Sequence, residues 1–215
     1  MKIAVDGPAG SGKSAVSKEL SRRLGIAYLN TGLVYRAFAY VCALENLEKE
    51  EVLKVFEKPL EVRLGVASTE VFYRGEEISQ KLASEEVGRM ASQIAILPSF
   101  RERINSFFRH LVGDGQAVVE GRDAGTHIFP QAELKVFLTA SAEERARRRF
   151  EQLKSKGIEV DYKEILKVIL ERDERDTKRP IYPFKPAEDA IVIDTTNLSL
   201  EEVVERVLSL IKERV

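Results

Sequence analysis

Short apolar runs alternate along the chain with longer stretches in which apolar residues recur every three or four positions. Continuous apolar runs of four or five residues are typical of strands buried on both faces of a parallel sheet. The longer period, seen in Val16, Leu20 and Leu24, predicts amphipathic helices. The expected strands are residues 2–6, 27–30, 116–120, 134–138 and 190–194. Strands and helices in alternation predict an α/β fold, a doubly wound parallel sheet with helices on both faces.

The expected helices have recognisable ends. We expect Thr31 and Ser199 to cap the helices that follow them, because a hydroxyl oxygen can accept a hydrogen bond from the first turn. Pro98 is expected to end the helix before it, because proline interrupts the helical hydrogen-bond ladder. The predicted helices are residues 13–24, 31–44, 84–97, 99–112, 142–154, 162–178 and 199–215, with a charged helical stretch at 45–59.

Residues 60–80 depart from this alternation. Apolar and polar residues alternate over 60–66, and a second short run follows at 70–74. Such alternation is typical of strands with one face in solvent. Together with residues 77–78 these runs predict a small antiparallel sheet inserted into the α/β pattern.

The segment Gly-Pro-Ala-Gly-Ser-Gly-Lys-Ser at residues 7–14 lies between the first predicted strand and the first predicted helix. This context gives the pattern G-x-x-x-x-G-K-[ST] its meaning as a phosphate-binding loop of the P-loop NTPase type. Its glycines let successive backbone N–H groups turn toward phosphate oxygens, and the helix N-terminus adds partial positive charge. Lys13 can reach the β- and γ-phosphates, and the Ser14 hydroxyl can hold Mg²⁺. The expected ATP-binding residues are Gly7, Pro8, Ala9, Gly10, Ser11, Gly12, Lys13, Ser14 and Ala15.

Arginines follow several of the predicted strands, where they are expected to face this loop. Open α/β sheets bind ligands at the carboxyl ends of their strands. Arginine suits phosphoryl transfer because its charge is permanent and its planar fork matches phosphate oxygens. Arg36, Arg122, Arg145 and Arg148 are such arginines, and Arg172 lies on the long helix before the last predicted strand. They indicate a kinase for a phosphorylated acceptor, although pairs such as Arg172 with Asp176 could also be ordinary i,i+4 ion pairs on a solvated helix face.

The ordered motifs resemble the bacterial cytidylate kinase family from one end of the chain to the other. The segments that carry the resemblance are residues 7–14, 30–36, 91–95, 120–126, 142–149 and 171–176. The resemblance implies transfer of a phosphoryl group from ATP to CMP or dCMP, with Mg²⁺ as cofactor. It also implies one kinase domain over 1–215. In that domain 1–30, 115–150 and 180–215 form the core, 31–114 the monophosphate-binding region, 151–162 a short lid and 163–179 the helix after it.

The same resemblance implies a role for each matching residue. Acceptor phosphate contacts fall to Arg36, Arg122 and Arg179, base contacts to Thr31, Asp123 and Arg101, and pentose contacts to Ser92, Arg172 and Asp176. The implied catalytic residues are Lys13, Arg122, Arg145, Arg148 and Arg179. Glu120 stands where many members of the family have Asp, and as a hypothesis its longer carboxylate could still orient Mg²⁺-bound water. The chemistry of the base supports one assignment independently. A carboxylate such as Asp123 can accept from the cytosine amino group, whereas uracil presents a carbonyl there.

Composition narrows the remaining choices. The formal net charge of −1 offers no field for nucleic acid or membranes, and the single cysteine, Cys42, forms no internal disulfide. No apolar run is long enough to cross a bilayer and no signal peptide is recognised, so we expect a cytoplasmic enzyme. The family resemblance implies that it is a monomer. An acceptor phosphate is already ionised, so His110 and His127 are expected to have structural or solvent-facing roles.

Two alternatives stay open. A kinase of similar fold could act on UMP or a small metabolite, which acceptor profiling would reveal. A regulatory or nucleic-acid-binding ATPase would lack this transfer, but no basic tail or aromatic-basic stripe supports it.

Overall fold

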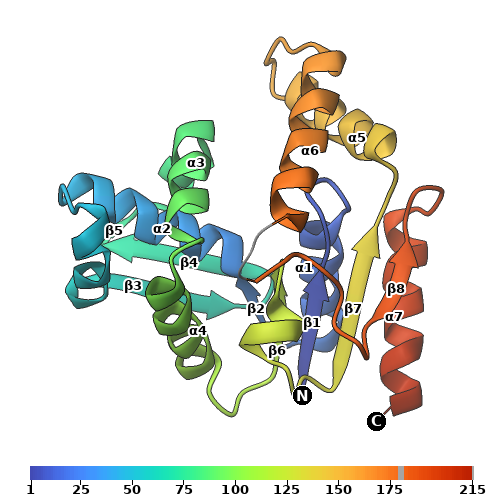
Figure 1. Cartoon of the computed structure of the whole chain (residues 1–215). Helices are drawn as coiled ribbons and strands as arrows, with labels where there is room; N and C mark the ends of the chain where they lie inside the picture. Colours follow the sequence, from blue (N-terminus) through green and yellow to red (C-terminus); the bar gives the residue numbers. More distant parts are fainter. Residues whose placement is uncertain (179–181, 215) are drawn as a thin grey trace.

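The computed structural model describes residues 1–178 and 182–214, and its centre is a five-stranded parallel sheet (Figure 1). Its strands are β1 (Lys2–Asp6), β2 (Ala27–Asn30), β6 (Ala117–Gly121), β7 (Leu134–Thr139) and β8 (Ile191–Asp194). They lie in the order β2-β6-β1-β7-β8, with every neighbouring pair parallel. The structure therefore confirms the predicted doubly wound α/β sheet.

Helices cover both faces of this sheet, and the alternation of side chains along β1 shows how. Ile3 and Val5 point to one face, which α1 (Lys13–Leu24) and α7 (Leu200–Arg214) cover. Ala4 points to the other, which α2 (Thr31–Leu44) and α4 (Pro98–Val112) cover. Because the central strands β1 and β6 (Ala117–Gly121) are buried on both faces, their sequences are continuous apolar runs, whereas Val192 on the edge strand β8 is 55% exposed.

The predicted insertion forms a three-stranded antiparallel sheet beside β2. It consists of β3 (Leu60–Gly65), β4 (Ser68–Tyr73) and the short β5 (Glu76–Glu77), in that order. The Thr69 side chain connects it to the main sheet by hydrogen bonds. The Thr69 hydroxyl donates to the backbone oxygen of Tyr28 at 2.7 Å and accepts from the N–H of Asn30 at 2.9 Å. The insertion therefore lies against the strand that leads into α2.

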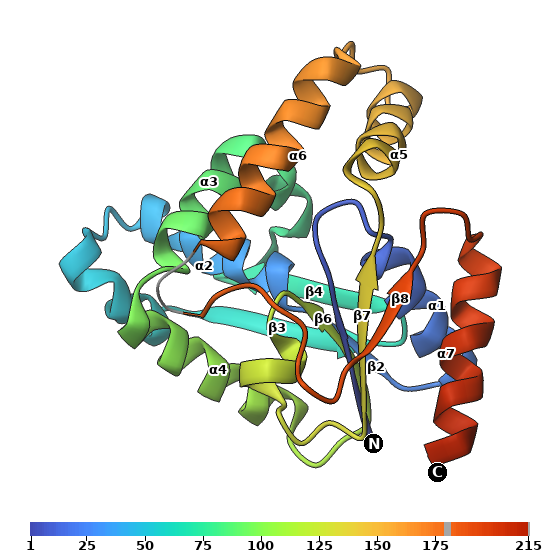
Figure 2. The same cartoon turned by 45° about the vertical axis from the view of Figure 1, so that its right-hand side comes forward.

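Two helices stand beyond the carboxyl ends of β1 and β7, α5 (Ala142–Ser155) and α6 (Tyr162–Thr177). Figures 1 and 2 show them side by side at the top of the molecule, joined by residues 156–161. Ser141 caps α5 by accepting from the N–H of Glu144. This helical hairpin therefore overhangs the edge at which the phosphate-binding loop lies.

The remaining elements complete the chain. They are the 3₁₀ segments η1 (Lys49–Glu57) and η2 (Ser79–Ala83), the helix α3 (Glu85–Ile94), and one π-helical turn, η3 (Ala124–Ile128). None of the helices in the described parts of the chain combines the length and apolarity that a bilayer crossing requires.

Several predicted element ends are wrong. Asn30, not Thr31, is the N-cap of α2, since its side chain accepts from the N–H of Leu33. Pro98 opens α4 instead of ending the helix before it, because the first helical position needs no donor. The stretch at 45–59 forms only the 3₁₀ segment η1. Ser199 does cap α7 as predicted, in a reciprocal pair with Glu202.

Candidate active site

The loop at residues 7–14 joins β1 to α1, and it packs closely against two neighbouring elements. A Cβ atom on Gly7 would lie 2.1 Å from the backbone oxygen of Leu138 in β7. Gly10 has a φ of +76°, and a Cβ atom there would lie 3.0 Å from the Cβ atom of Arg145 in α5. Only glycine can adopt these backbone conformations and also leave room for the neighbouring atoms. The packing thus holds the loop in the curled form that phosphate binding requires.

Lys13 is folded back over this loop. Its Nζ donates to the backbone oxygen of Pro8 at 2.7 Å. Burial and the nearby Arg122 guanidinium lower the pKa of Lys13 to about 7, against the opposing effects of Glu120 and Asp6. A bound polyphosphate would add negative charge beside Nζ and favour its charged form. Lys13 therefore lies where it can exchange a backbone oxygen for a phosphate oxygen.

Ser14 and Glu120 meet at the predicted magnesium position. The Ser14 hydroxyl donates to Oε1 of Glu120 at 2.8 Å, while Oε2 is buried without a hydrogen-bond partner in the described residues. Burial raises the pKa of Glu120. Hydroxyl and carboxylate oxygens beside a phosphate-binding loop are the donors that Mg²⁺ prefers, so the residues present fit this ion. No group of three or more His, Cys, Asp or Glu side chains in 1–178 and 182–214 is arranged to hold a metal ion by itself.

Asp6 joins the phosphate-binding loop to the turn that follows β6, and the sequence analysis missed it. Its two carboxylate oxygens accept from the N–H groups of Ala124 and Gly125, each at 2.8 Å. Burial raises its pKa to about 6, against the lowering effect of these two hydrogen bonds. Asp6 immediately precedes Gly7, so one carboxylate fixes the spacing between the loop and Asp123. Its position at the end of a strand that precedes the loop was the available signal.

Arg101 and Asp123, both predicted to contact the base, form a buried pair. Nη2 of Arg101 donates to Oδ2 of Asp123 at 2.6 Å, and Nη1 donates to the Tyr35 hydroxyl at 3.1 Å. The Thr31 hydroxyl donates to the backbone oxygen of Glu120, three residues before Asp123, at 2.8 Å. The Thr31 oxygen keeps lone pairs that can accept from a ligand.

A second cluster joins the turn after β6 to α6. Nη1 of Arg122 donates to Oδ2 of Asp176 at 2.7 Å, and Nε of Arg172 lies 3.9 Å from the same oxygen. The Arg122 guanidinium also lies over the Phe184 ring, 5.1 Å from its centroid. These three predicted acceptor residues are therefore brought together. Arg179, predicted for the acceptor phosphate, lies outside the described residues.

Arg36 and Ser92 bond to backbone oxygens in this structure. Arg36 donates to the backbone oxygens of Leu82 and Ser84 at 2.9 and 2.8 Å. Burial, and then the nearby Arg172 guanidinium, lower the pKa of Arg36. The Ser92 hydroxyl donates to the Gly88 oxygen one turn earlier in α3.

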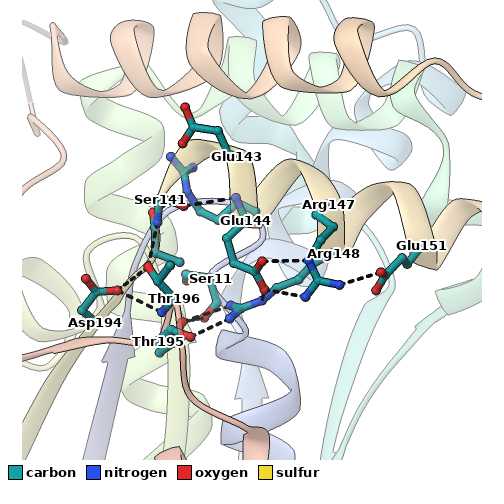
Figure 3. A network of polar contacts seen from close by, with 12 residues as sticks. Ser11, Ser141, Glu143, Glu144, Arg147, Arg148, Glu151, Asp194, Thr195 and Thr196 are labelled. Carbon is teal, nitrogen blue, oxygen red and sulfur yellow. Dashed lines mark hydrogen bonds and ion pairs between the residues drawn. The ribbon is translucent and has the colours of Figure 1, made fainter.

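Arg145 and Arg148 of α5 face the loop, whereas Arg147 and Arg149 do not. Arg145 donates to the Ala9 backbone oxygen at 3.3 Å and pairs with Asp173 of α6. Arg148 donates to the hydroxyl and backbone oxygen of Thr195 at 3.0 and 2.6 Å (Figure 3). Arg147 instead points to solvent and pairs with Glu144 and Glu151 on its own helix.

A cavity of about 260 Å³ lies beside the loop on the side of Arg148. Its lining includes Gly12, Ala15, Arg148, Thr195 and Leu198. It therefore has the loop at one end and mixed polar and apolar walls, a lining suited to a flat heterocycle.

Comparisons with known proteins agree with this geometry. The sequence matches the model of the cytidylate kinase family over residues 3–213. It is 56% identical over 215 residues to the cytidylate kinase of Aquifex aeolicus, covering 100% of this chain and 97% of the relative. It is 46% identical over 212 residues to that of Pseudomonas aeruginosa, covering 96% and 93%.

Solved structures resemble the chain in fold alone. The shikimate kinase of Bacteroides thetaiotaomicron aligns with a TM-score of 0.51 at 14% identity, covering 99% of this chain and 98% of that one. An uncharacterized protein from Eubacterium ventriosum aligns with a TM-score of 0.54 at 16% identity, covering 100% and 99%.

Proposed function

The chain belongs to the cytidylate kinase family, and we propose that it transfers the γ-phosphoryl group of ATP to CMP or dCMP, giving ADP and CDP or dCDP. The observation that carries the proposal is the placement of the buried Arg101–Asp123 pair across the sheet edge from the phosphate-binding loop. Asp6 links the two by its bonds to Ala124 and Gly125. Residues that recognise the base and a loop that binds phosphate, both held at one edge of the sheet, suit in-line transfer between two nucleotides.

On the donor side, the loop N–H groups and Lys13 would hold the β- and γ-phosphates of ATP. The cavity beside Arg148 would take the donor's nucleoside, because it opens next to Gly12 and Ala15 at the start of α1. Mg²⁺ bound to Ser14, with Glu120 orienting its water, would neutralise charge on the phosphate oxygens.

On the acceptor side, Asp123 would accept from the cytosine amino group while Arg101 donates to the base carbonyl. The Thr31 oxygen would be a second acceptor for the amino group, since its own proton goes to the Glu120 backbone oxygen. Uracil would place a carbonyl against the Asp123 carboxylate and leave buried polar atoms unpaired.

The arginines would supply the electrostatic part of the catalysis. Arg36, Arg122 and Arg179 are proposed to hold the acceptor phosphate, and Arg172, Asp176 and Ser92 the pentose. Arg145 and Arg148, with Lys13, would stabilise charge on the moving phosphoryl group. Arg122 and Arg145 now pair with Asp176 and Asp173, so substrate binding would exchange carboxylate oxygens for phosphate oxygens. No general base is required, because the attacking phosphate oxygen carries no proton at neutral pH.

We also propose that residues 151–162, which include the tip between α5 and α6, form the lid. Arg145 and Arg148 lie at the base of this hairpin, so its movement would bring them toward the phosphates and exclude water. ATP hydrolysis without acceptor should then be slow. A monomeric state and a cytoplasmic location remain predictions.

The test of the proposed function is ADP release from Mg-ATP with CMP, dCMP, UMP, AMP or GMP offered separately. Turnover led by CMP or dCMP is expected. Preference for UMP would retain the kinase and overturn the roles of Asp123 and Arg101. No turnover with any of the five would leave only the nucleotide-binding loop and redirect the search to other acceptors.

A further inference from the structure

Tyr182 lies over the Arg101 guanidinium, although the two residues belong to distant parts of the chain. The guanidinium carbon of Arg101 lies 4.6 Å from the centroid of the Tyr182 ring. The Tyr182 ring also meets the His127 ring edge-on, with centroids 4.5 Å apart. A cation over an aromatic face is attracted by the negative face of the ring. Tyr182 therefore contacts the residue proposed to read the base, and His127 supports it from the turn after β6.

The backbone of Tyr182 is unusual for so large a residue. Its φ is +57°, in the left-handed region that glycine and asparagine favour. A bulky side chain held in that region indicates that contacts elsewhere stabilise it, and the Arg101 and His127 contacts are the ones described for the ring. The local sequence alone would not select tyrosine for this conformation.

Arg101 itself has hydrogen-bonding capacity left. It is 3% exposed, and its Nε has no hydrogen-bond partner within the described residues. A buried, unsatisfied N–H is costly unless a ligand satisfies it. The guanidinium is planar and its N–H groups lie in that plane. Whatever fixes the plane therefore fixes the direction in which the unused donor points.

We propose that Tyr182 is a positioning residue for the acceptor base, which it serves by holding the Arg101 guanidinium in the plane that matches a pyrimidine carbonyl. The inference rests on the proposed function of the Arg101–Asp123 pair. Tyr182 acts through its ring face and not through its hydroxyl. It adds to base recognition a contact from the segment after α6, which the loop and β6 do not supply.

The test compares Tyr182→Phe, Tyr182→Leu and Tyr182→Gly with the wild-type enzyme. Loss of the cation–π contact in Tyr182→Leu should raise the KM for CMP about tenfold. Tyr182→Phe keeps the ring face and should stay within about twofold of wild type. Tyr182→Gly removes the ring but suits the positive φ, so it should raise the KM for CMP like the leucine variant without a fall in the melting temperature.

Three readouts separate positioning from a structural role. The KM for ATP and the kcat at saturating CMP should stay near wild type in all three variants, whereas the preference for CMP over UMP should fall in Tyr182→Leu and Tyr182→Gly. An unchanged KM for CMP in both of these variants would overturn the inference, as would a parallel rise in the KM for ATP. A wild-type enzyme with no preference for CMP over UMP would instead overturn the proposed function, and the inference with it.

Discussion

The proposed donor cradle, residues 7–14, and the proposed acceptor surface differ in how the chain builds them. The cradle is one contiguous segment between β1 and α1, whose curl depends on glycines packed against Leu138 and Arg145. The acceptor surface collects Arg36 from α2, Arg101 from α4, Asp123 from the turn after β6 and Asp176 from α6. The cradle therefore depends on local conformation, and the acceptor surface on the packing of distant elements.

The two regions also differ in charge. Lys13 is the one ionisable side chain of the cradle, and burial lowers its pKa. On the acceptor surface, Arg101 and Arg122 already pair with the carboxylates of Asp123 and Asp176. Lys13 would therefore exchange only the neutral backbone oxygen of Pro8 for a phosphate oxygen, whereas Arg101 and Arg122 would exchange carboxylates when a ligand binds. Each prediction below changes one side of this comparison and asks whether the other side responds.

The largest expected effect is on the cradle, in Lys13→Met. Removal of its charge should lower kcat by about 10³-fold, because stabilisation of the transferring phosphoryl group is electrostatic. The KM for CMP should change little, since the acceptor surface is built elsewhere. Steady-state kinetics at saturating substrates measures both values, and a fall in kcat of less than tenfold would contradict the assignment.

Asp6→Asn tests the link between the two regions through pH. The folded protein holds the Asp6 proton more tightly than the unfolded chain, because its pKa rises from 3.8 to about 6. As pH rises from 3.8 to about 6, the contribution of this carboxyl group to the free energy of unfolding therefore falls. Above that range its contribution no longer changes with pH. The full change is about 3 kcal/mol.

Asparagine does not titrate, so the Asp6→Asn variant should lack this pH-dependent contribution to the free energy of unfolding. Urea unfolding of both proteins across the same pH range should show the stability difference between wild type and Asp6→Asn narrowing as pH rises. The other titrating groups are shared and cancel in the difference. A difference that stays constant with pH would show that Asp6 keeps its ordinary pKa.

Asp123→Asn tests the acceptor surface alone. The amide keeps the size of the carboxylate but can donate to a carbonyl, so the preference for CMP over UMP should fall about 100-fold. Asparagine is preferable to alanine here, because an unpaired buried Arg101 would cost about 3–5 kcal/mol of stability. The ratio of kcat/KM for the two nucleotides measures the effect, and the KM for ATP is the control. An unchanged ratio would remove Asp123 from base recognition.

The smallest effects are expected at two neighbouring arginines of α5. The Arg147 side chain is 53% exposed and pairs on its own helix, so Arg147→Ala should change stability by less than about 0.5 kcal/mol and leave the KM for ATP unchanged. The Arg148 side chain is 25% exposed and reaches Thr195, so Arg148→Ala should cost about 1–2 kcal/mol of stability, raise the KM for ATP and lower kcat, though by less than Lys13→Met. Equal effects in the two variants would contradict the separation of their roles.

Local patterns predicted most of the fold correctly. The runs at 2–6 and 27–30 and the periodic stretch at 13–24 match β1, β2 and α1 residue for residue. The errors at Thr31 and Pro98 occur at element ends, where neighbouring residues compete for the same capping position or turn. The stretch at 45–59 differs in type, since its interior forms the 3₁₀ segment η1. The π-helical turn η3 had no local signal, because the Asp6 carboxylate that accepts from its backbone lies in another strand.

The chain's own sequence determined the phosphate-binding loop, the order of strands and helices and the position of the inserted sheet, since each depends on residues close together in sequence. Only the tertiary structure decided which charges meet. It paired Arg145 with Asp173, Arg148 with Thr195 and Arg101 with Asp123, and placed Tyr182 over Arg101. The physical reason is the distance along the chain over which each kind of interaction acts. Backbone conformation follows near neighbours, whereas a buried charge is stabilised by whichever partner the packing brings within about 3 Å.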